Sequence, residues 1–490
     1  MADYRWTALA VTTVGTLMAS IDTNIVVIAL PTIARSLPGI SILALLWILI
    51  GYSLVTSVLL LSVGRLADQF GRVRLFTLGF AVFTVGSALC GFAGSGGELV
   101  AFRMVQAVGA ALLFANGTAI VTDAFPPHQR ALALGINQVA IVIGSVSGLV
   151  LGGLLTATVG WRWIFFVNVP VGIVAVAVGA WKLRDVTPPE RDQPIDWLGN
   201  VLFAAGLTLV LVAATTGPLD VVSSGAAIAL AGAGLLVLAG FVAVERIARA
   251  PMFDLRLFRV AAFSGGNISI FLNALARGAF AFVIVFYLQG PPRFLSPLTA
   301  GIYLIPVSAA LAATAPLSGW LSDRYGVRPF AVSGLGISAV GFAWLTALGT
   351  TTPYAGMLPG FLLVGAGMGL YAAPNRASIM NAVPANRRGV AAGISATLIM
   401  AASTASLAFA IGILSTTVSL GDLTAVFLGT PTAAGGAVAA AAPFLGAVRL
   451  VFALSAVVVA LAIIPSAIGG GPSPPGGRHH RRRPPFSAVD

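Results

Sequence analysis

Long runs of apolar residues, separated by short polar segments, extend from near residue 8 to near residue 469. Many of these runs reach about 20 residues, the length that an α-helix needs to cross the hydrocarbon core of a bilayer. The alternation of apolar and polar residues that would indicate membrane strands is absent. We therefore predict an all-α integral membrane protein with fourteen transmembrane helices, at residues 8–31, 42–63, 73–94, 98–122, 131–158, 162–182, 196–216, 223–245, 262–289, 297–320, 328–350, 354–376, 389–416 and 445–468.

Two polar loops occur twice in the chain. The segment GRLADQFGRVR at 64–74 resembles GWLSDRYGVR at 319–328, 255 residues later. The segment AFPPHQRALALGI at 124–136 resembles AVPANRRGVAAGI at 382–394, 258 residues later. Because both pairs share nearly one spacing, they indicate a duplicated half, and internal repeats in an apolar chain are typical of secondary transporters.

The repeat also predicts how the helices are divided. Six helices precede residue 183, six of matching pattern begin at 262, and two in between match neither half. The predicted parts are an N-terminal six-helix bundle at 1–182, two extra linker helices at 183–261, a C-terminal six-helix bundle at 262–469 and a disordered basic tail at 470–490.

The positive charges predict an orientation for this arrangement. With the N-terminus inside, 21 of the 27 Lys and Arg residues face the cytoplasm, four face outward, and Arg103 and Arg277 lie within helices. This is a strong positive-inside bias. It predicts a multi-pass protein of the cell (inner) membrane with both termini cytoplasmic. The bias also explains the net charge of +12: the positive charges lie in loops that face anionic lipid headgroups, so they do not indicate nucleic-acid binding.

The composition narrows the function classes further. The chain is 58% hydrophobic and 9% charged, whereas soluble proteins carry about 25% charged residues. The motifs HExxH and GxSxG are absent, and the single lysine, Lys182, is followed by Leu183, which excludes a Walker A phosphate loop. The three histidines lie in loops or in the tail. No catalytic residue, metal site or cofactor is therefore predicted.

One acidic residue lies deep within the first predicted helix. An ionised carboxylate at Asp22 costs on the order of a few kcal/mol or more. Because a low-dielectric environment disfavours the charged form, such a carboxyl can exchange a proton. Arg103 in the fourth helix needs a partner, so we predict a charge pair that breaks on protonation. The alternatives are a structural hydrogen bond for Asp22 and an Arg103 that snorkels to the outer interface.

Other polar residues occur at similar depths. Asn273, Arg277 and Phe280 form a stripe on the ninth predicted helix that we expect to line a cavity. The full set of candidate cavity residues is Gln106, Asn116, Asn137, Gln138, Asn273, Arg277 and Phe280. An interhelical hydrogen bond is the alternative for each polar member.

Glycines and charges mark two further features. Gly144, Gly148 and Gly152 recur at spacing four in the fifth helix, which predicts a smooth face where another helix approaches closely. In the duplicated loop, glycines permit tight turns, and an acid near a helix N-terminus is favoured by the dipole. We predict that this cluster latches the two halves in one state; a plain topological charge loop is the alternative. The candidate gating residues are Gly64, Asp68, Gly71, Arg72, Asp123 and Asp323.

These residues resemble the major facilitator superfamily, in its fourteen-helix drug:proton antiporter branch, over nearly the whole chain. GRLADQFGRVR looks like the family's loop between helices 2 and 3, and IDTNIVVIALP resembles the branch's first-helix signature. AFRMVQAVGAA is similar to its fourth-helix motif, with Ala107 where glycine is usual. WRWIFFVNVPVG at 161–172 looks like another branch signature.

The resemblance implies alternating access, in which two six-helix bundles rock around a central cavity. It implies that Asp22 is the proton-linked carboxylate and Arg103 the arginine tied to coupling. Asp68, Arg72 and Asp123 match the family's inner latch. The set Gly144, Gly148, Gly152 and Gly153 matches the antiporter motif of helix 5, with Leu149 in place of the usual proline.

We therefore expect a proton-coupled antiporter that exports lipophilic compounds, including monovalent cations, since only one deep carboxylate is available to neutralise them. The expected partners are a small lipophilic substrate, protons and membrane lipids, with no nucleic acid, and we expect a monomer. Export of a lipid or endogenous metabolite on the same fold is the alternative. A passive channel is less favoured, because pores usually carry rings of similar groups, and an enzyme is least favoured.

Overall fold

The computed structural model describes residues 2–126, 129–186, 196–248, 251, 253–290, 293–384, 388–418 and 436–469. Within these residues the regular secondary structure is helical, without strands. In this part of the chain, 14 helical spans are long and apolar enough to cross a membrane. The predicted all-α fold with fourteen membrane helices is confirmed.

The helices follow the predicted spans closely, with the first and last longer than expected. Their bounds are α1 Ala2–Ser36, α2 Ile42–Phe70, α3 Arg72–Phe92, α4 Gly96–Ala124, α5 Arg130–Thr158, α6 Trp163–Phe166, α7 Asn168–Lys182, α8 Trp197–Thr216, α9 Ser224–Ile247, the 3-10 helix η1 Leu255–Arg259, α10 Ala261–Arg277, α11 Phe280–Gln289, α12 Pro297–Tyr325, α13 Val327–Leu345, α14 Tyr354–Asn381, α15 Arg388–Thr417 and α17 Gly436–Gly469. The predicted tail at 470–490 lies outside the described residues.

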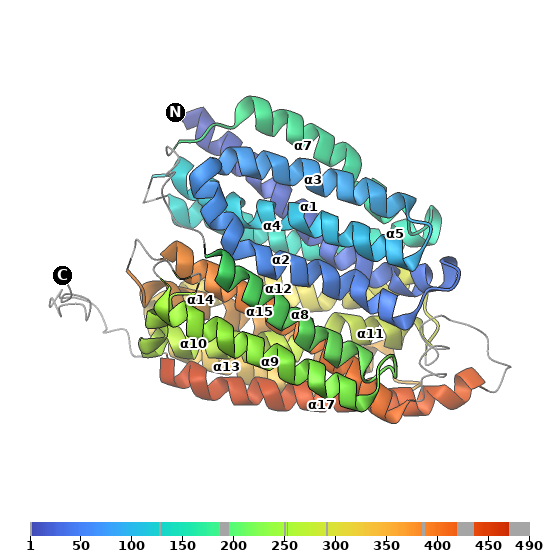
Figure 1. Cartoon of the computed structure of the whole chain (residues 1–490). Helices are drawn as coiled ribbons and strands as arrows, with labels where there is room; N and C mark the ends of the chain where they lie inside the picture. The colour runs from blue at the N-terminus through green and yellow to red at the C-terminus, as the bar shows by residue number, and fades with distance from the viewer. Residues whose placement is uncertain are drawn as a thin grey trace.

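The long helices run roughly side by side and gather into two groups (Figure 1). In the first group α1 packs against α5, and α3 packs against α4 and α7; in the second, α14 packs against α12 and α13. Helix α1 begins and α17 ends at the same end of the molecule. We call this the inner end, following the predicted topology, and the opposite end the outer end. The orientation in the membrane and the domain boundaries stay predictions.

The pair α8 and α9, predicted to match neither half, packs as a hairpin against α2 and α15. The Trp47 indole of α2 donates a hydrogen bond to Thr215 Oγ1 of α8 at 3.3 Å. A methyl group added at Gly412 of α15 would lie 3.7 Å from Pro218, just beyond α8. The hairpin therefore contacts one helix from each group.

Two of the predicted spans are each divided into two helices, which corrects the expectation of continuous helices. The span 162–182 divides at Val167 into α6 and α7; Pro170, in the first turn of α7, has no N–H with which to continue the preceding helix. The span 262–289 divides at Gly278 and Ala279. There the Ala279 amide donates to Ser406 Oγ of α15 at 2.9 Å, a partner outside its own helix.

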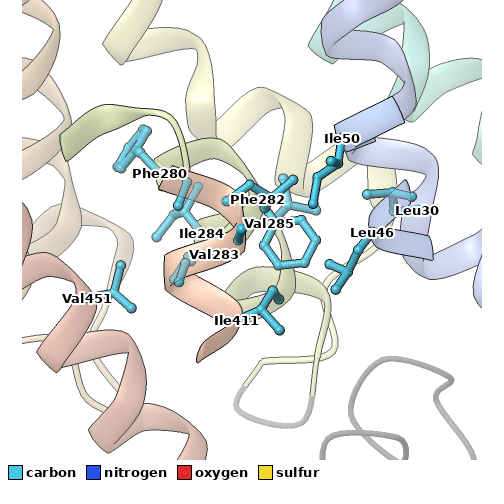
Figure 2. Packing of buried hydrophobic residues seen from close by; sticks show 14 of the residues in the cluster. Leu30, Leu46, Ile50, Phe280, Phe282, Val283, Ile284, Val285, Ile411 and Val451 are labelled. Atoms are coloured by element: carbon cyan, nitrogen blue, oxygen red, sulfur yellow. The ribbon is translucent and has the colours of Figure 1, made fainter. Parts of the chain in front are cut away.

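Apolar side chains join the two groups near the outer end. Figure 2 shows Phe282 and Val285 of α11 close to Leu30, Leu46 and Ile50 of the first group. We call the set Leu30, Leu46, Ile50, Phe282, Val285 and Ile411 the outer cluster. Every residue of α11 from Phe282 to Gln289 is at most 4% exposed. A helix that is apolar and buried all round is packed on every side, so α11 is enclosed by its neighbours at the outer end.

Candidate functional site

The centre of the candidate site is an ion pair inside the first group of helices. Arg103 Nη1 of α4 lies 2.6 Å from Asp22 Oδ2 of α1. The two side chains are 1% and 0% exposed, so Arg103 does not snorkel to the interface. Taking both charges out of water is costly, and removal of one partner from such a pair typically costs about 3–5 kcal/mol. Each residue therefore depends on the other.

Two amide side chains complete the coordination of the Asp22 carboxylate. Gln106 Nε2, one turn after Arg103, donates to Asp22 Oδ1 at 2.8 Å, while its Oε1 accepts from Arg103 Nη1 at 2.7 Å. Asn168 Nδ2, the first residue of α7, donates to Asp22 Oδ1 at 3.2 Å and to Ser87 Oγ at 3.1 Å. Both carboxylate oxygens thus accept hydrogen bonds, which offsets part of the desolvation of the charge.

Aromatic and backbone groups surround the guanidinium. Arg103 Cζ lies 4.1 Å from the centroid of the Tyr52 ring, a cation–π arrangement. Arg103 Nε donates to the Ile48 carbonyl of α2 at 3.4 Å. The Cys90 thiol of α3 lies 3.8 Å from Gln106 Oε1. The cluster therefore draws on α1, α2, α3, α4 and α7, so a change in its charge reaches most helices of this group.

The glycines of α5 fix the position of the helix that carries Asp22. A methyl group at Gly144 would lie 2.7 Å from Ser20 Cβ, and one at Gly148 would lie 2.7 Å from the Ile21 carbonyl oxygen. At Gly152 the contact would be 2.4 Å from Ile28. These glycines let α5 approach α1 closely, as predicted from their spacing. Gly153 points elsewhere, with Pro297 O of α12 at 2.6 Å from its added methyl group.

Two members of the cluster, Asn168 and Ser87, were not predicted from the sequence. Asn168 is a lone amide in the apolar segment WRWIFFVNVPVG at 161–172. An amide deep in an apolar run is costly unless paired, and that signal was available. Ser87 carried no such signal, because a serine hydroxyl in a membrane helix can bond to its own backbone.

The cytoplasmic loop cluster is brought together only in part. Arg72 and Asp123, both candidate gating residues, form an ion pair at 2.6 Å, with 29% and 20% of their side chains exposed. They join α3 to α4 within one group. The latch between the two halves stays a prediction, because the side chains of Asp68 and Asp323 are not described. The acid at the N-terminus of α3 is Asp185, which accepts from the Val73 amide at 2.8 Å and was missed.

The glycines of this loop behave differently from one another. Gly71 separates α2 from α3 with φ of 99°, and Gly326 repeats that turn with φ of 88°, a region that favours glycine. Gly64, by contrast, lies inside α2, so the tight turn expected there is wrong. The side chains of Asp68 and Asp323 lie outside the described residues.

Several candidate cavity residues lie elsewhere. Gln106 belongs to the ion-pair cluster, and the Asn116 amide, 1% exposed, donates to the Leu112 carbonyl of its own helix. Phe280 starts α11 and packs against Phe342, Phe361 and Phe452, so the expected continuous stripe is wrong.

The remaining cavity candidates differ in exposure. Asn137 and Asn273 are buried, and Arg277 is half-buried at the end of α10. The Gln138 side chain is not among those described. In the described part of the chain, no three His, Cys, Asp or Glu side chains are placed to hold a metal ion.

Comparison with known proteins assigns the family. The family model described as Major Facilitator Superfamily matches residues 12–407 and 266–489. The riboflavin transporter RibZ of Clostridioides difficile (strain 630) is 32% identical over 409 residues, 83% of this chain and 86% of that protein. The multidrug resistance protein Stp of Mycobacterium tuberculosis (strain CDC 1551 / Oshkosh) is 34% identical over 387 residues, 79% of this chain and 71% of that protein.

Solved structures agree on the fold. A bacterial homolog of the human lysosomal transporter Spinster superimposes with a TM-score of 0.68 at 16% identity, covering 95% of this chain and 97% of that chain. At that identity the similarity concerns the fold alone. The chain therefore belongs to the major facilitator superfamily, its 14 membrane-competent helices among the described residues fit the fourteen-helix branch, and it is a multi-pass membrane transporter rather than an enzyme.

Proposed function

We propose that this transporter exports lipophilic compounds in exchange for protons, by alternating access of a site between the two groups of helices. The observation that carries the proposal is the buried ion pair of Asp22 and Arg103. A carboxylate held by one cation and two amides inside a membrane protein marks a proton-linked site more often than a passive structural one. The similarity to a multidrug resistance protein supports export as the direction.

Protonation of Asp22 would weaken the contact between the helices that the Asp22–Arg103 pair joins. A proton on Asp22 removes the charge that attracts Arg103, so the guanidinium then relies on Gln106, Tyr52 and the Ile48 carbonyl. Helices α1 and α4 are no longer joined by opposite charges and can shift relative to each other. In the proposed cycle a proton from outside neutralises Asp22 as the substrate leaves, and the protonated carrier returns to the inner-open state.

The structure does not support the expectation that the substrates are monovalent cations. That expectation depended on a deep carboxylate free to neutralise the substrate. In this structure Asp22 is 0% exposed and both its oxygens are occupied by protein donors. We therefore retain proton coupling and leave the cation out of the proposal.

The test is transport by Asp22→Asn in proteoliposomes with an imposed pH gradient. The asparagine oxygen can still accept from Arg103, so the variant is expected to fold, while a group that does not titrate cannot exchange a proton. We expect loss of gradient-driven efflux of lipophilic dyes, measured together with the accompanying proton movement. The matched control is Asp220→Asn, an exposed acid with φ of 52° between α8 and α9, where asparagine is tolerated. Full gradient-driven transport by Asp22→Asn would contradict the proposal.

Transport of an endogenous metabolite is the second candidate, because RibZ, whose name identifies a riboflavin transporter, is similar over 83% of this chain. Efflux assays on one panel of dyes, lipids and riboflavin separate the two functions. Saturable riboflavin transport with no dye transport would favour the metabolite carrier.

A further inference from the structure

We propose that the substrate carries a negative charge and that Arg277 and Arg376 of the second group of helices bind it. This inference rests on the proposed transport function and names the substrate class of that transporter. It begins from charge balance: the deep acid of the first half is neutralised by Arg103. In the second half Arg277 lies in α10, and Arg376 lies within α14 because that helix continues to Asn381; neither has an ion-pair partner among the described residues.

Arg277 occupies the position that corresponds to Asp22. The first of the duplicated loops, at 64–74, recurs 255 residues later, and Arg277 follows Asp22 by the same number. The acid of one half is thus replaced by a cation at the matching depth of the other. The side chain is half-buried, and among the described residues it has no hydrogen bond or ion pair. A charged side chain without a partner costs free energy at this depth in a membrane protein. A bound anionic ligand would offset that cost.

The face of α10 that carries Arg277 points between two neighbouring helices. Ser269 contacts α14, where it accepts a hydrogen bond from the Tyr371 hydroxyl at 2.9 Å. Gly278 contacts α15, where an added methyl group would lie 2.6 Å from Ser403. At ~100° per residue, Arg277 falls between these two faces. Since α14 and α15 flank it, and α11 just beyond it contacts α1, this face points toward the first group of helices.

Arg376 lies on the corresponding face of α14. This helix meets α13 at Gly367 and α12 at Gly369, where added methyl groups would clash with Ser338 and Thr314, and it meets α10 through the Asn375 amide, which donates to the Gly266 carbonyl at 3.2 Å. Helical geometry puts Arg376 between the α10 and α12 faces and away from α13. The side chain is exposed and, within the described residues, unpaired. Because α12 borders α5 and α1, this face also looks toward the first group.

The second half offers few acids to neutralise these arginines. Between residues 262 and 469 the sequence has only Asp323 and Asp422. Asp323 is near the inner end of α12, and its side chain is not described; Asp422 falls between the described segments. Arg376 is five residues from the inner end of α14, and Arg277 ends α10, farther from that end. The two cations therefore lie at successive depths, an arrangement that draws a carboxylate or another anion inward from the inner end.

The test compares two dyes that share one xanthene framework, fluorescein, which is anionic at neutral pH, and rhodamine 123, which is cationic. Binding of each dye to the purified full chain in lipid nanodiscs is followed by fluorescence anisotropy, without a pH gradient. We expect fluorescein to bind at least about tenfold more tightly than rhodamine 123, the scale of one charge-assisted contact. Because no gradient is present, this result does not depend on proton coupling.

The variants locate the charge. Arg277→Gln and Arg376→Gln should each weaken fluorescein binding about tenfold or more and leave rhodamine 123 binding unchanged or stronger. Arg277→Lys should retain part of the affinity, which guards against a folding defect in the glutamine variant. Arg328→Gln at the exposed start of α13 makes the same change in net charge and should have no effect.

Three outcomes would overturn the proposal: wild-type protein without saturable fluorescein binding, equal or tighter binding of rhodamine 123, or wild-type affinity for fluorescein in both glutamine variants. The proposed proton coupling fails on a different result, gradient-driven transport by Asp22→Asn. A transporter that passes one test and fails the other would therefore reveal which of the two ideas is wrong.

Discussion

Asp22 accepts hydrogen bonds from three side chains on two other helices, Arg103 and Gln106 of α4 and Asn168 of α7. Asn168 is the member that ties the acid to α7 and, through Ser87, to α3. Ser87 in turn donates to the Phe165 carbonyl at 2.9 Å. The charge on one residue is therefore supported by a chain of donors and acceptors that crosses the bundle, in which each buried group satisfies the next.

We predict that Asn168→Ala lowers the free energy of unfolding by about 1–3 kcal/mol, because it removes one donor from Asp22 and leaves Ser87 without that partner. Thermal or denaturant unfolding in detergent measures the change. Asn24→Ala is the control, since among the described residues the Asn24 amide donates only to the Ser20 carbonyl of its own helix. Equal losses in the two variants would mean that the link from Asp22 to Ser87 contributes nothing specific.

At the level of helices, α5 and α12 cross closely near the outer end. A methyl group at Gly301 would lie 2.5 Å from the Leu149 carbonyl oxygen, and one at Gly153 would lie 2.6 Å from the Pro297 carbonyl oxygen. The Gln289 amide of α11 donates to the Ile28 carbonyl of α1 at 3.0 Å. Together with the outer cluster, these contacts join the two groups, and an outward-open state has to break them. The proline usual in the fifth-helix motif is Leu149, whose carbonyl forms part of this crossing.

We predict that Gly301→Leu favours the outward-open state, because the added side chain cannot fit at the crossing of α5 and α12. Spin labels at Phe70→Cys and Tyr325→Cys, exposed matching positions at the inner ends of α2 and α12, report the change as a shorter distance. Cys90 is buried and does not interfere. Gly336→Leu on α13, where an added methyl group meets nothing within 4 Å, should leave the distance unchanged. An unaltered distance in Gly301→Leu would show that this crossing does not hold the outer end closed.

Across the whole molecule, protonation of Asp22 is proposed to set which end is open. The first group of helices holds the acid, and the second contributes α11 and α12 to the contacts at the outer end. The hairpin α8–α9 lies beside α2 and α15, which leaves α5 and α12 as the other lateral border between the groups. For proton coupling, a change in the Asp22–Arg103 pair must alter the contacts at the outer end. Helix α1 can link the two, because it carries Asp22 and also contributes to the outer contacts.

We predict that lowering the pH lengthens the mean distance between labels at Phe70 and Tyr325, because the protonated carrier favours the inner-open state. Asp22→Asn should keep the long distance at every pH, since its uncharged side chain mimics protonation. Double electron–electron resonance in nanodiscs measures both. If the variant follows pH as the wild type does, another group controls the conformational change.

Much of this molecule could be predicted from the sequence. The lengths of the apolar runs gave the helices, because a bilayer requires backbone hydrogen bonds to be satisfied within each span. The duplicated loops predicted the matching turns at Gly71 and Gly326. The pairing of Asp22 with Arg103 was predictable because burying either charge alone is energetically costly, and these are the opposite charges deep within the predicted helices of the first half.

Only the tertiary structure decided which faces meet. Apolar helices carry little periodic signal to show their rotation, so the position of Asn168 beside Asp22 and the unpaired state of Arg277 depended on close packing between helices far apart in the chain. The break before α11 likewise depends on Ser406, 127 residues away. Sequence alone determined the number of membrane spans and the charges they contain, because those depend on the local cost of burying polar groups in a bilayer. The partners of those charges depend on three-dimensional packing, which no local pattern encodes.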